Sequence, residues 1–183
     1  YPGEYSAICC SRIAGPTSSR EGRSMQAKAG VIELLNRILT ADLTAVNQYF
    51  LHAKMCEHWG YARLHHTVRQ RSIDEMRDVD ALIAHILYLE GVPNMQRLGT
   101  VTVGETVAEQ FAVDLAAEHE MLTLLSEGVT HCAQVADYTT RHMLETMVQD
   151  VDEHIDWIET QQELIRQLGL EQYLSEQIKK EAS

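Results

Sequence analysis

Residues that interrupt helices are scarce in this sequence, which has three prolines and ten glycines among 183 residues. Proline removes a backbone donor and glycine costs conformational entropy, so a chain with few of either can form long uninterrupted helices. Because 45% of the residues are hydrophobic, the chain can still bury a sizeable core within one domain. The composition therefore predicts an all-α protein.

Basic residues are also in short supply. The chain has 15 Lys and Arg against 27 Asp and Glu, which gives a formal net charge of -12. A surface that binds nucleic acid is normally basic, so this balance argues against DNA or RNA as a partner. An acidic chain suits a protein that handles cations, although solvated acidic faces are common in proteins of other classes as well.

Recognisable cysteine motifs and membrane segments are lacking too. The four cysteines, Cys9, Cys10, Cys56 and Cys132, have neither zinc-site nor redox spacing, so a reducing compartment is expected. No run approaches the roughly 20 apolar residues that cross a bilayer. Residues 1–24 contain no long apolar segment followed by a cleavage site. These features predict a soluble cytoplasmic protein with no membrane partner.

The N-terminal residues differ from the rest of the chain. Residues 1–24 mix Gly, Pro, Ser and Arg without a period, and amphipathic order begins only after Met25, the first methionine. We therefore expect residues 1–24 to be a disordered or non-native extension, or to follow an upstream start, and residues 25–183 to form the domain.

Apolar residues recur at three- and four-residue steps along four long stretches, as expected of amphipathic helices. A polar connection follows the second stretch at residues 89–105, and it is long enough to cross the length of a bundle. Thr106 with Glu109 can cap the third helix, and Asp137 can cap the fourth, which should end before Gly169. The first, second and fifth helices are expected at about residues 28–58, 61–88 and 171–179, and the apolar stripe of the third runs from Val107 to Val129. This order predicts a ferritin-like four-helix bundle with a long crossover and a short fifth helix.

Each long helix carries ionisable residues on or beside its apolar stripe. Glu75 interrupts the stripe of the second helix, and a buried carboxylate needs a hydrogen bond, an ion pair or a metal. Taken singly, such a residue is more often a satisfied core group than a ligand. Their occurrence near the middle of all four helices predicts a metal site for iron, manganese or zinc. The candidate ligands are Asp42, Glu75, Asp78, Glu118 and His154.

Several separated stretches of the chain resemble bacterioferritins, from Met25 to about Ile178. They read NQYFLHA at residues 47–53, SIDEM at 72–76, LEGVPN at 89–94, DLA at 114–116 and HIDW at 154–157. The resemblance implies an iron-storage cage of 24 subunits, with haem between two-fold-related subunits. It also implies a di-iron ferroxidase centre inside each bundle.

The resemblance also shows where this chain departs from the family's six di-iron ligands. Asp42 stands where the first helix supplies Glu, Asp78 stands where the second helix supplies His, and Val151 stands where the fourth helix supplies a bridging Glu. Asp150 is a poor substitute because one residue rotates a side chain by about 100° around a helix. We expect the degenerate site to bind a single hard cation or no metal, and its crowded carboxylates to have raised pKa values.

Met76 follows Glu75 directly, so a helix turns its side chain about 100° away from the metal face. A helical methionine is usually packing material. The resemblance, however, places Met76 at the position that supplies the axial haem ligand, one from each subunit across a two-fold axis. A b-type haem is therefore the expected cofactor.

A haem ligand beside a damaged ferroxidase centre predicts a haem-carrying subunit of a mixed cage, in which a partner subunit supplies ferroxidase activity and haem carries electrons for iron release. Two alternatives remain open. The chain could oxidise Fe(II) itself at an atypical carboxylate-rich site in a homomeric cage, or it could be a DNA-protecting mini-ferritin of the Dps type.

Overall fold

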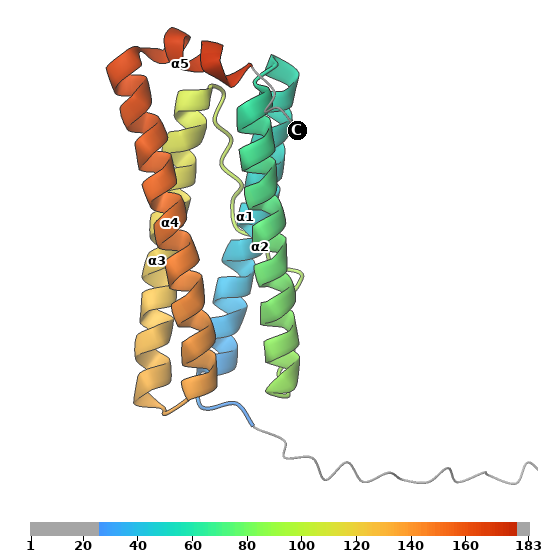
Figure 1. Cartoon of the computed structure of the whole chain (residues 1–183). Helices are drawn as coiled ribbons and strands as arrows, with labels where there is room; N and C mark the ends of the chain where they lie inside the picture. The colour runs from blue at the N-terminus through green and yellow to red at the C-terminus, as the bar shows by residue number, and fades with distance from the viewer. Residues whose placement is uncertain (1–25, 179–183) are drawn as a thin grey trace, which may run out of the picture.

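The computed structural model describes residues 26–178, and every regular element in this part of the chain is a helix (Figure 1). The predicted all-α fold is therefore confirmed. Four long helices and one short one follow each other along the chain: α1 Val31–Trp59, α2 Ala62–Tyr88, α3 Val107–Gln134, α4 Tyr138–Leu168 and α5 Leu170–Gln177. The expectations for residues 1–24, and the predicted end of the fifth helix at residue 179, lie outside the described residues.

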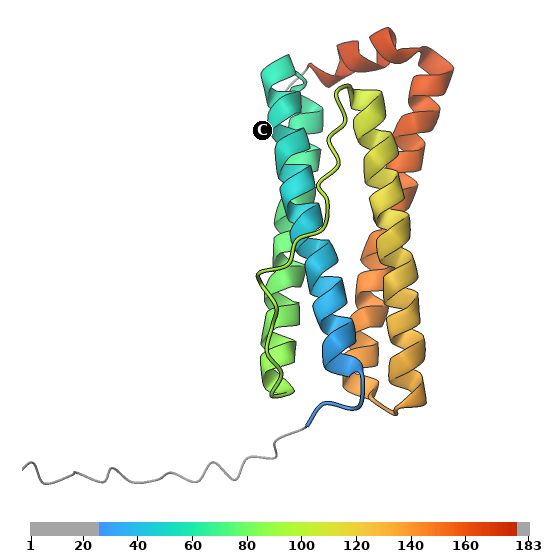
Figure 2. The same cartoon turned by 180° about the vertical axis from the view of Figure 1, so that it is seen from behind.

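The long helices form two antiparallel pairs, α1 with α2 and α3 with α4, and α1 also packs on α3. The connection between α2 and α3 runs lengthwise beside α1 (Figure 2). Helix α3 can therefore start at the end of the bundle opposite to where α2 stops. Helix α5 crosses one end of the bundle and contacts α4 and α2 (Figure 1). This is the predicted four-helix bundle with its crossover.

The predicted caps hold the starts of the last two long helices. The Thr106 hydroxyl accepts the N–H of Glu109 at 3.2 Å, while the Glu109 carboxylate reaches one residue further back than a capping box requires and accepts the N–H of Glu105 at 2.9 Å. Asp137 accepts the N–H of Thr140 at 3.0 Å. Both N-cap residues were predicted correctly from the sequence, because the first backbone amides of a helix need acceptors from outside the helix.

A row of polar side chains on α1 secures the crossover. Residues four or eight apart share one side of a helix, and here each accepts one backbone N–H from the connection at 2.6 to 3.2 Å. The pairs, acceptor first, are Asn36 with Asn94, Thr44 with Gly99, Gln48 with Thr102, and His52 with Gly104. The connection thus satisfies part of its backbone without forming regular structure.

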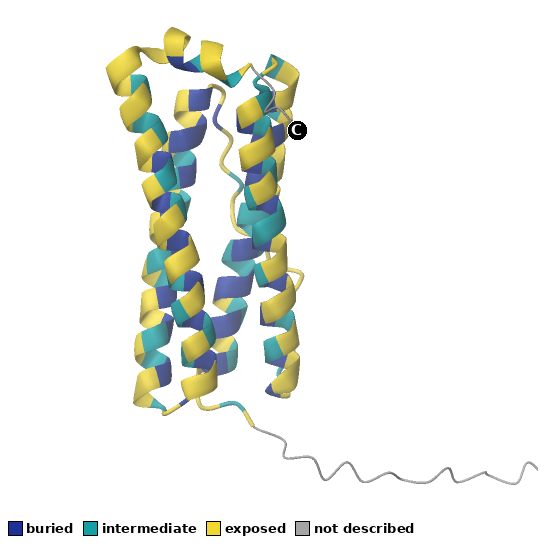
Figure 3. Cartoon of the chain, in the orientation of Figure 1, coloured by how far each residue is buried: buried dark blue, intermediate teal, exposed yellow. Residues whose placement is uncertain are grey.

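Buried residues recur along the inward-facing sides of the helices, alternating with residues of intermediate exposure (Figure 3). The largest core cluster includes Leu35, Ile38, Leu82, Leu125 and Leu144, from all four long helices. A second cluster under α5 contains Phe111, Ile158 and Tyr173. Among the described residues, none of the helices combines the length and the apolarity that crossing a bilayer requires.

Candidate metal centre

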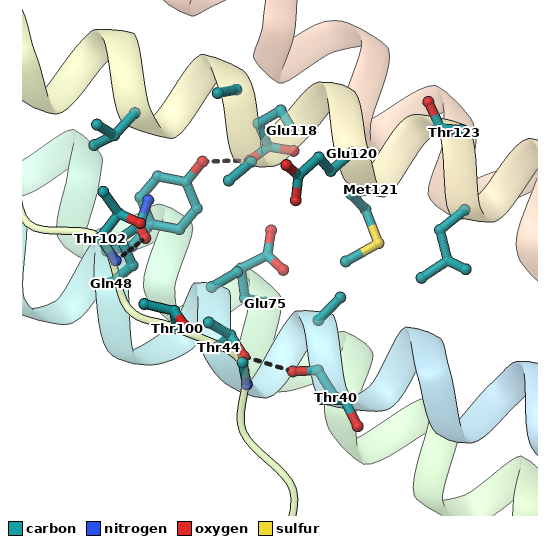
Figure 4. A pocket seen from close by; sticks show the side chains of 18 of the residues that line it. Thr40, Thr44, Gln48, Glu75, Thr100, Thr102, Glu118, Glu120, Met121 and Thr123 are labelled. Carbon is teal, nitrogen blue, oxygen red and sulfur yellow. Dashed lines mark hydrogen bonds between the residues drawn. The ribbon is translucent and has the colours of Figure 1, made fainter.

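The five candidate ligands come together near the middle of the bundle. Asp42, Glu75 and Glu118 are buried, whereas Asp78 and His154 are partly buried. Glu75 on α2 and Glu118 on α3 reach the same cavity beside α1 (Figure 4). Asp42 lies near enough for Glu75, Asp78 and Glu118 to affect its ionisation. The helical spacing in the sequence therefore located the cluster.

Sequence reasoning missed Arg71, which pairs with two carboxylates of this cluster. Its Nη2 lies 2.6 Å from Oε1 of Glu75, and it donates to both carboxylate oxygens of Glu118 at 3.2 and 3.3 Å. Only 10% of the Arg71 side chain is exposed. Arg71 precedes Glu75 by four residues, the spacing of a helical ion pair, so this signal was available in the sequence.

Aromatic rings line the α4 side of the cluster. The His154 imidazole stacks on Trp157 with ring centroids 5.5 Å apart, and the Tyr49 ring meets it edge-on at the same distance. The Tyr49 hydroxyl donates a short hydrogen bond to Glu118. Val151, on the same helix, is buried in the apolar core and offers no ligand atom. The fourth helix thus contributes one imidazole.

Crowding and burial shift the pKa values of the cluster, as expected from the sequence. Burial and the neighbouring carboxylates Glu118 and Asp78 raise the pKa of Glu75 to about 8, against the opposing effect of Arg71. Burial is also the main reason that the pKa of Asp78 rises to about 6 and that of Asp42 rises well above its usual range. For His154, burial and then Arg71 lower the pKa to about 3, so its imidazole is neutral.

Two buried polar atoms of the cluster have no hydrogen-bond partner, Oδ2 of Asp42 and Nε2 of His154. The imidazole nitrogen lies 3.7 Å from Oε1 of Glu118, too far for a hydrogen bond. Within residues 26–178, no three His, Cys, Asp or Glu side chains are arranged to hold a metal ion together. The ligand roles predicted for these residues remain predictions.

Two cavities reach the cluster from different sides of the bundle. One, of about 520 Å³, is lined by Glu75, Glu118 and Tyr49 together with residues of the connection (Figure 4). The other, of about 500 Å³, lies between α2 and α4 and is lined by Arg71, Asp78 and His154. Arg71 and its two carboxylate partners therefore stand between the cavities.

Met76 faces away from this cluster, in the direction that the helical turn predicts, and 54% of it is exposed. The Ser72 hydroxyl donates to the carbonyl of Val46, and the Arg69 guanidinium lies 4.7 Å from the centre of the Phe50 ring. Because α1 and α2 run in opposite directions, these two contacts place Met76 beside the part of α1 that lies about one turn before Val46. The thioether is thus presented on the outer surface of the α1–α2 pair.

The bundle, its crossover and the polar cluster define a ferritin-like protein, and residues 32–168 match the family model described as a ferritin-like domain. The chain is 48% identical over 149 residues to a bacterioferritin of Mycobacterium leprae, covering 81% of this chain and 94% of that protein. It is 46% identical over the same length to bacterioferritin BfrA of Mycobacterium tuberculosis, with the same coverage. A bacterioferritin of Streptomyces coelicolor is 45% identical over 151 residues, or 82% of this chain and 90% of that protein. The chain belongs to the bacterioferritin family.

The residues present do not fit the di-iron centre that the resemblance implies. The Arg71 guanidinium lies between Glu75 and Glu118, two of the carboxylates that would hold iron. Val151 presents methyl groups where a bridging carboxylate is expected, and Asp78 replaces an imidazole. A pair of divalent ions would have to share this space with a fixed positive charge.

Proposed function

We propose that this chain is an iron-storage subunit that assembles into a bacterioferritin cage. Its membership of the family carries the proposal. The acidic composition, with a net charge of -12, suits a protein that collects cations and opposes the alternative of a DNA-binding mini-ferritin. Tight DNA binding in a gel shift at moderate salt would favour the mini-ferritin instead.

The proposal includes a haem held by Met76. A thioether is a suitable axial ligand for haem iron, and the Met76 side chain is exposed on the surface of α2 rather than packed in the core. A two-fold interface would present the same residue from both subunits, which suits two axial methionines. When bound, haem would supply a one-electron carrier for reducing stored ferric iron.

Met76→Ala tests the haem assignment in the purified full chain. Because the substitution removes the sulfur ligand, we expect haem affinity to fall by at least about tenfold, measured as the Soret absorbance per subunit after reconstitution. Met95→Ala is the matched control, since Met95 is also about half exposed but lies on the connection, away from α2. Unchanged haem content in Met76→Ala would refute the assignment.

The proposal also holds that ferroxidase activity is reduced in this chain and supplied by a partner subunit with a complete centre. Arg71 between Glu75 and Glu118 is the observation that supports this division. The rival is a chain that oxidises Fe(II) itself. It is favoured by the unpartnered Asp42 Oδ2 and His154 Nε2, which could serve as ligands. The rate of Fe(II) oxidation by the homomeric protein separates the two functions.

A further inference from the structure

The middle of the bundle already contains a cation of its own. Arg71 is four residues before Glu75 on α2, and its guanidinium also reaches across to Glu118 on α3. It thereby links two helices that belong to different pairs. Since arginine does not lose its proton in proteins, this positive charge is permanent.

We propose that the Arg71 guanidinium takes the place of metal in this bundle, completing the centre without iron and excluding divalent cations from it. The inference rests on the proposed function in one respect, because it explains the reduced ferroxidase activity. It does not depend on haem, because the proposed haem ligand Met76 lies on another face of α2 and haem content is measured separately.

The Arg71 guanidinium is held by direct contacts with both carboxylates. Its terminal nitrogen meets one oxygen of Glu75 and both oxygens of Glu118, and the Tyr49 hydroxyl adds a donor to Glu118. These contacts direct positive charge and hydrogen-bond donors at both carboxylates. A divalent ion would have to displace the guanidinium into the cavity between α2 and α4 before it could bind Glu75 and Glu118 together.

Moving Arg71 out is opposed by what surrounds it. The side chain is almost buried, and its contacts with Glu75 and Glu118 are made by one terminal nitrogen of the guanidinium, Nη2, while Nε has no hydrogen-bond partner. On α4, Val151 and Ile155 are buried apolar residues of the core, whereas the carboxylates of Asp150 and Glu153 line the cavity between α2 and α4. Val151, at the position where a bridging carboxylate is expected, therefore offers a metal ion no oxygen ligand to compensate for the lost ion pairs.

Removing the guanidinium should leave a set of metal ligands behind. Asp42 and His154 each retain a buried atom without a partner, and Glu75 and Glu118 would lose their cation. Carboxylates and an imidazole together suit a transition-metal ion. The proposal thus predicts that metal binding is suppressed by one residue and can be recovered by replacing it.

Arg71→Gln in the full chain tests this prediction, with Co²⁺ as the probe because its absorption bands report coordination. After treatment with chelator, Co²⁺ should leave the Tm and the visible spectrum of the natural chain unchanged. Arg71→Gln should have a lower Tm in chelator, because a buried ion pair is broken. Added Co²⁺ should raise that Tm and bind at least about tenfold more tightly than to the natural chain.

Two further variants show whether the gained Co²⁺ binding is specific to the site around Arg71. Arg166→Gln removes an exposed arginine that pairs with Glu163 on α4, and it should behave like the natural chain. Arg71→Gln combined with Glu118→Gln should lose the Co²⁺ response, which places the gained site in the bundle. Should Arg71→Gln fail to fold, Arg71→Leu also removes the charge and should show the same gain in Co²⁺ binding.

Co²⁺ bands in the natural chain that disappear in Glu118→Gln would overturn the proposal, and so would the absence of any gain in a folded Arg71→Gln. Haem content, read from the Soret band of the same samples, should match in Arg71→Gln and the natural chain. Loss of haem in Met76→Ala leaves the Co²⁺ results unaffected, so either idea can fail alone.

Discussion

At the scale of single residues, Glu75 and Met76 show how one helical step separates two sites. Glu75 is buried against Arg71, while Met76 is exposed on the outer side of the same helix. The difference of about 100° per residue makes this separation unavoidable on a helix. The sequence SIDEM at residues 72–76 can therefore serve the interior and the surface at once.

Replacing Val151 by a charged residue should be costly for stability. Val151→Glu would introduce a carboxyl group into an apolar site near the Asp42, Glu75 and Glu118 cluster, where Arg71 is already paired. An unpaired buried charge costs about 3 to 5 kcal/mol, so we expect the Tm at pH 8 to fall by roughly 10 °C in a thermal melt.

The control for Val151→Glu is Val151→Gln, because glutamine has nearly the size of glutamate and carries no charge. Burial raises the folded-state pKa of an introduced carboxyl above its unfolded value of about 4.3, so its penalty grows as pH rises. The difference in Tm between the two variants should therefore be large at pH 8 and small at pH 5. Equal Tm values at both pH values would contradict the placement of Val151 in a closed core.

At the scale of elements, side chains of α1 hold the connection between α2 and α3 in place. Residues 89–105 have no regular period, yet α1 side chains accept four of the connection's backbone amides. His52 and Gln48 also bind the buried carboxylate of Asp114 on α3. The same α1 face therefore joins the connection and the second helix pair.

Thr44→Val tests this role, because it removes the acceptor of the Gly99 N–H and keeps the side-chain shape. The substitution also removes the hydrogen bond from the Thr44 hydroxyl to the Thr40 carbonyl within α1. Loss of the hydrogen bond to Gly99 should cost about 1 kcal/mol and speed amide exchange in peptides covering the connection, measured by hydrogen–deuterium exchange with mass spectrometry.

Thr40→Val is the matched control for Thr44→Val, because the Thr40 hydroxyl donates only to the carbonyl of Asn36 within α1. Exchange in the connection should stay at the level of the natural chain in this variant. Equal acceleration in both variants would mean that α1 itself had loosened.

At the scale of the whole molecule, the proposed division of labour between subunits predicts the iron chemistry of the assembled protein. With Arg71 between Glu75 and Glu118, the homomeric protein should oxidise Fe(II) little faster than buffer does, followed by stopped-flow absorbance. Co-assembly with a bacterioferritin subunit that has all six ligands should restore rapid oxidation. Fast, saturable oxidation by the homomer would support the rival function.

Much of this protein followed from its sequence alone. The spacing of apolar residues predicted all four long helices, and the pairs Thr106 with Glu109 and Asp137 with Thr140 mark helix starts because those starts depend on neighbours in the chain. The polar residues on the apolar stripes predicted a buried cluster. The direction of Met76 followed from the helical turn.

The identity of the cation in that cluster depended on tertiary structure. The spacing of Arg71 and Glu75 allows an ion pair, but an arginine at that spacing can equally point into solvent. Its contact with Glu118, 47 residues away, exists only once α2 and α3 meet in the bundle. Local periodicity determined where charges gather, and the packing of distant helices decided which of them became partners.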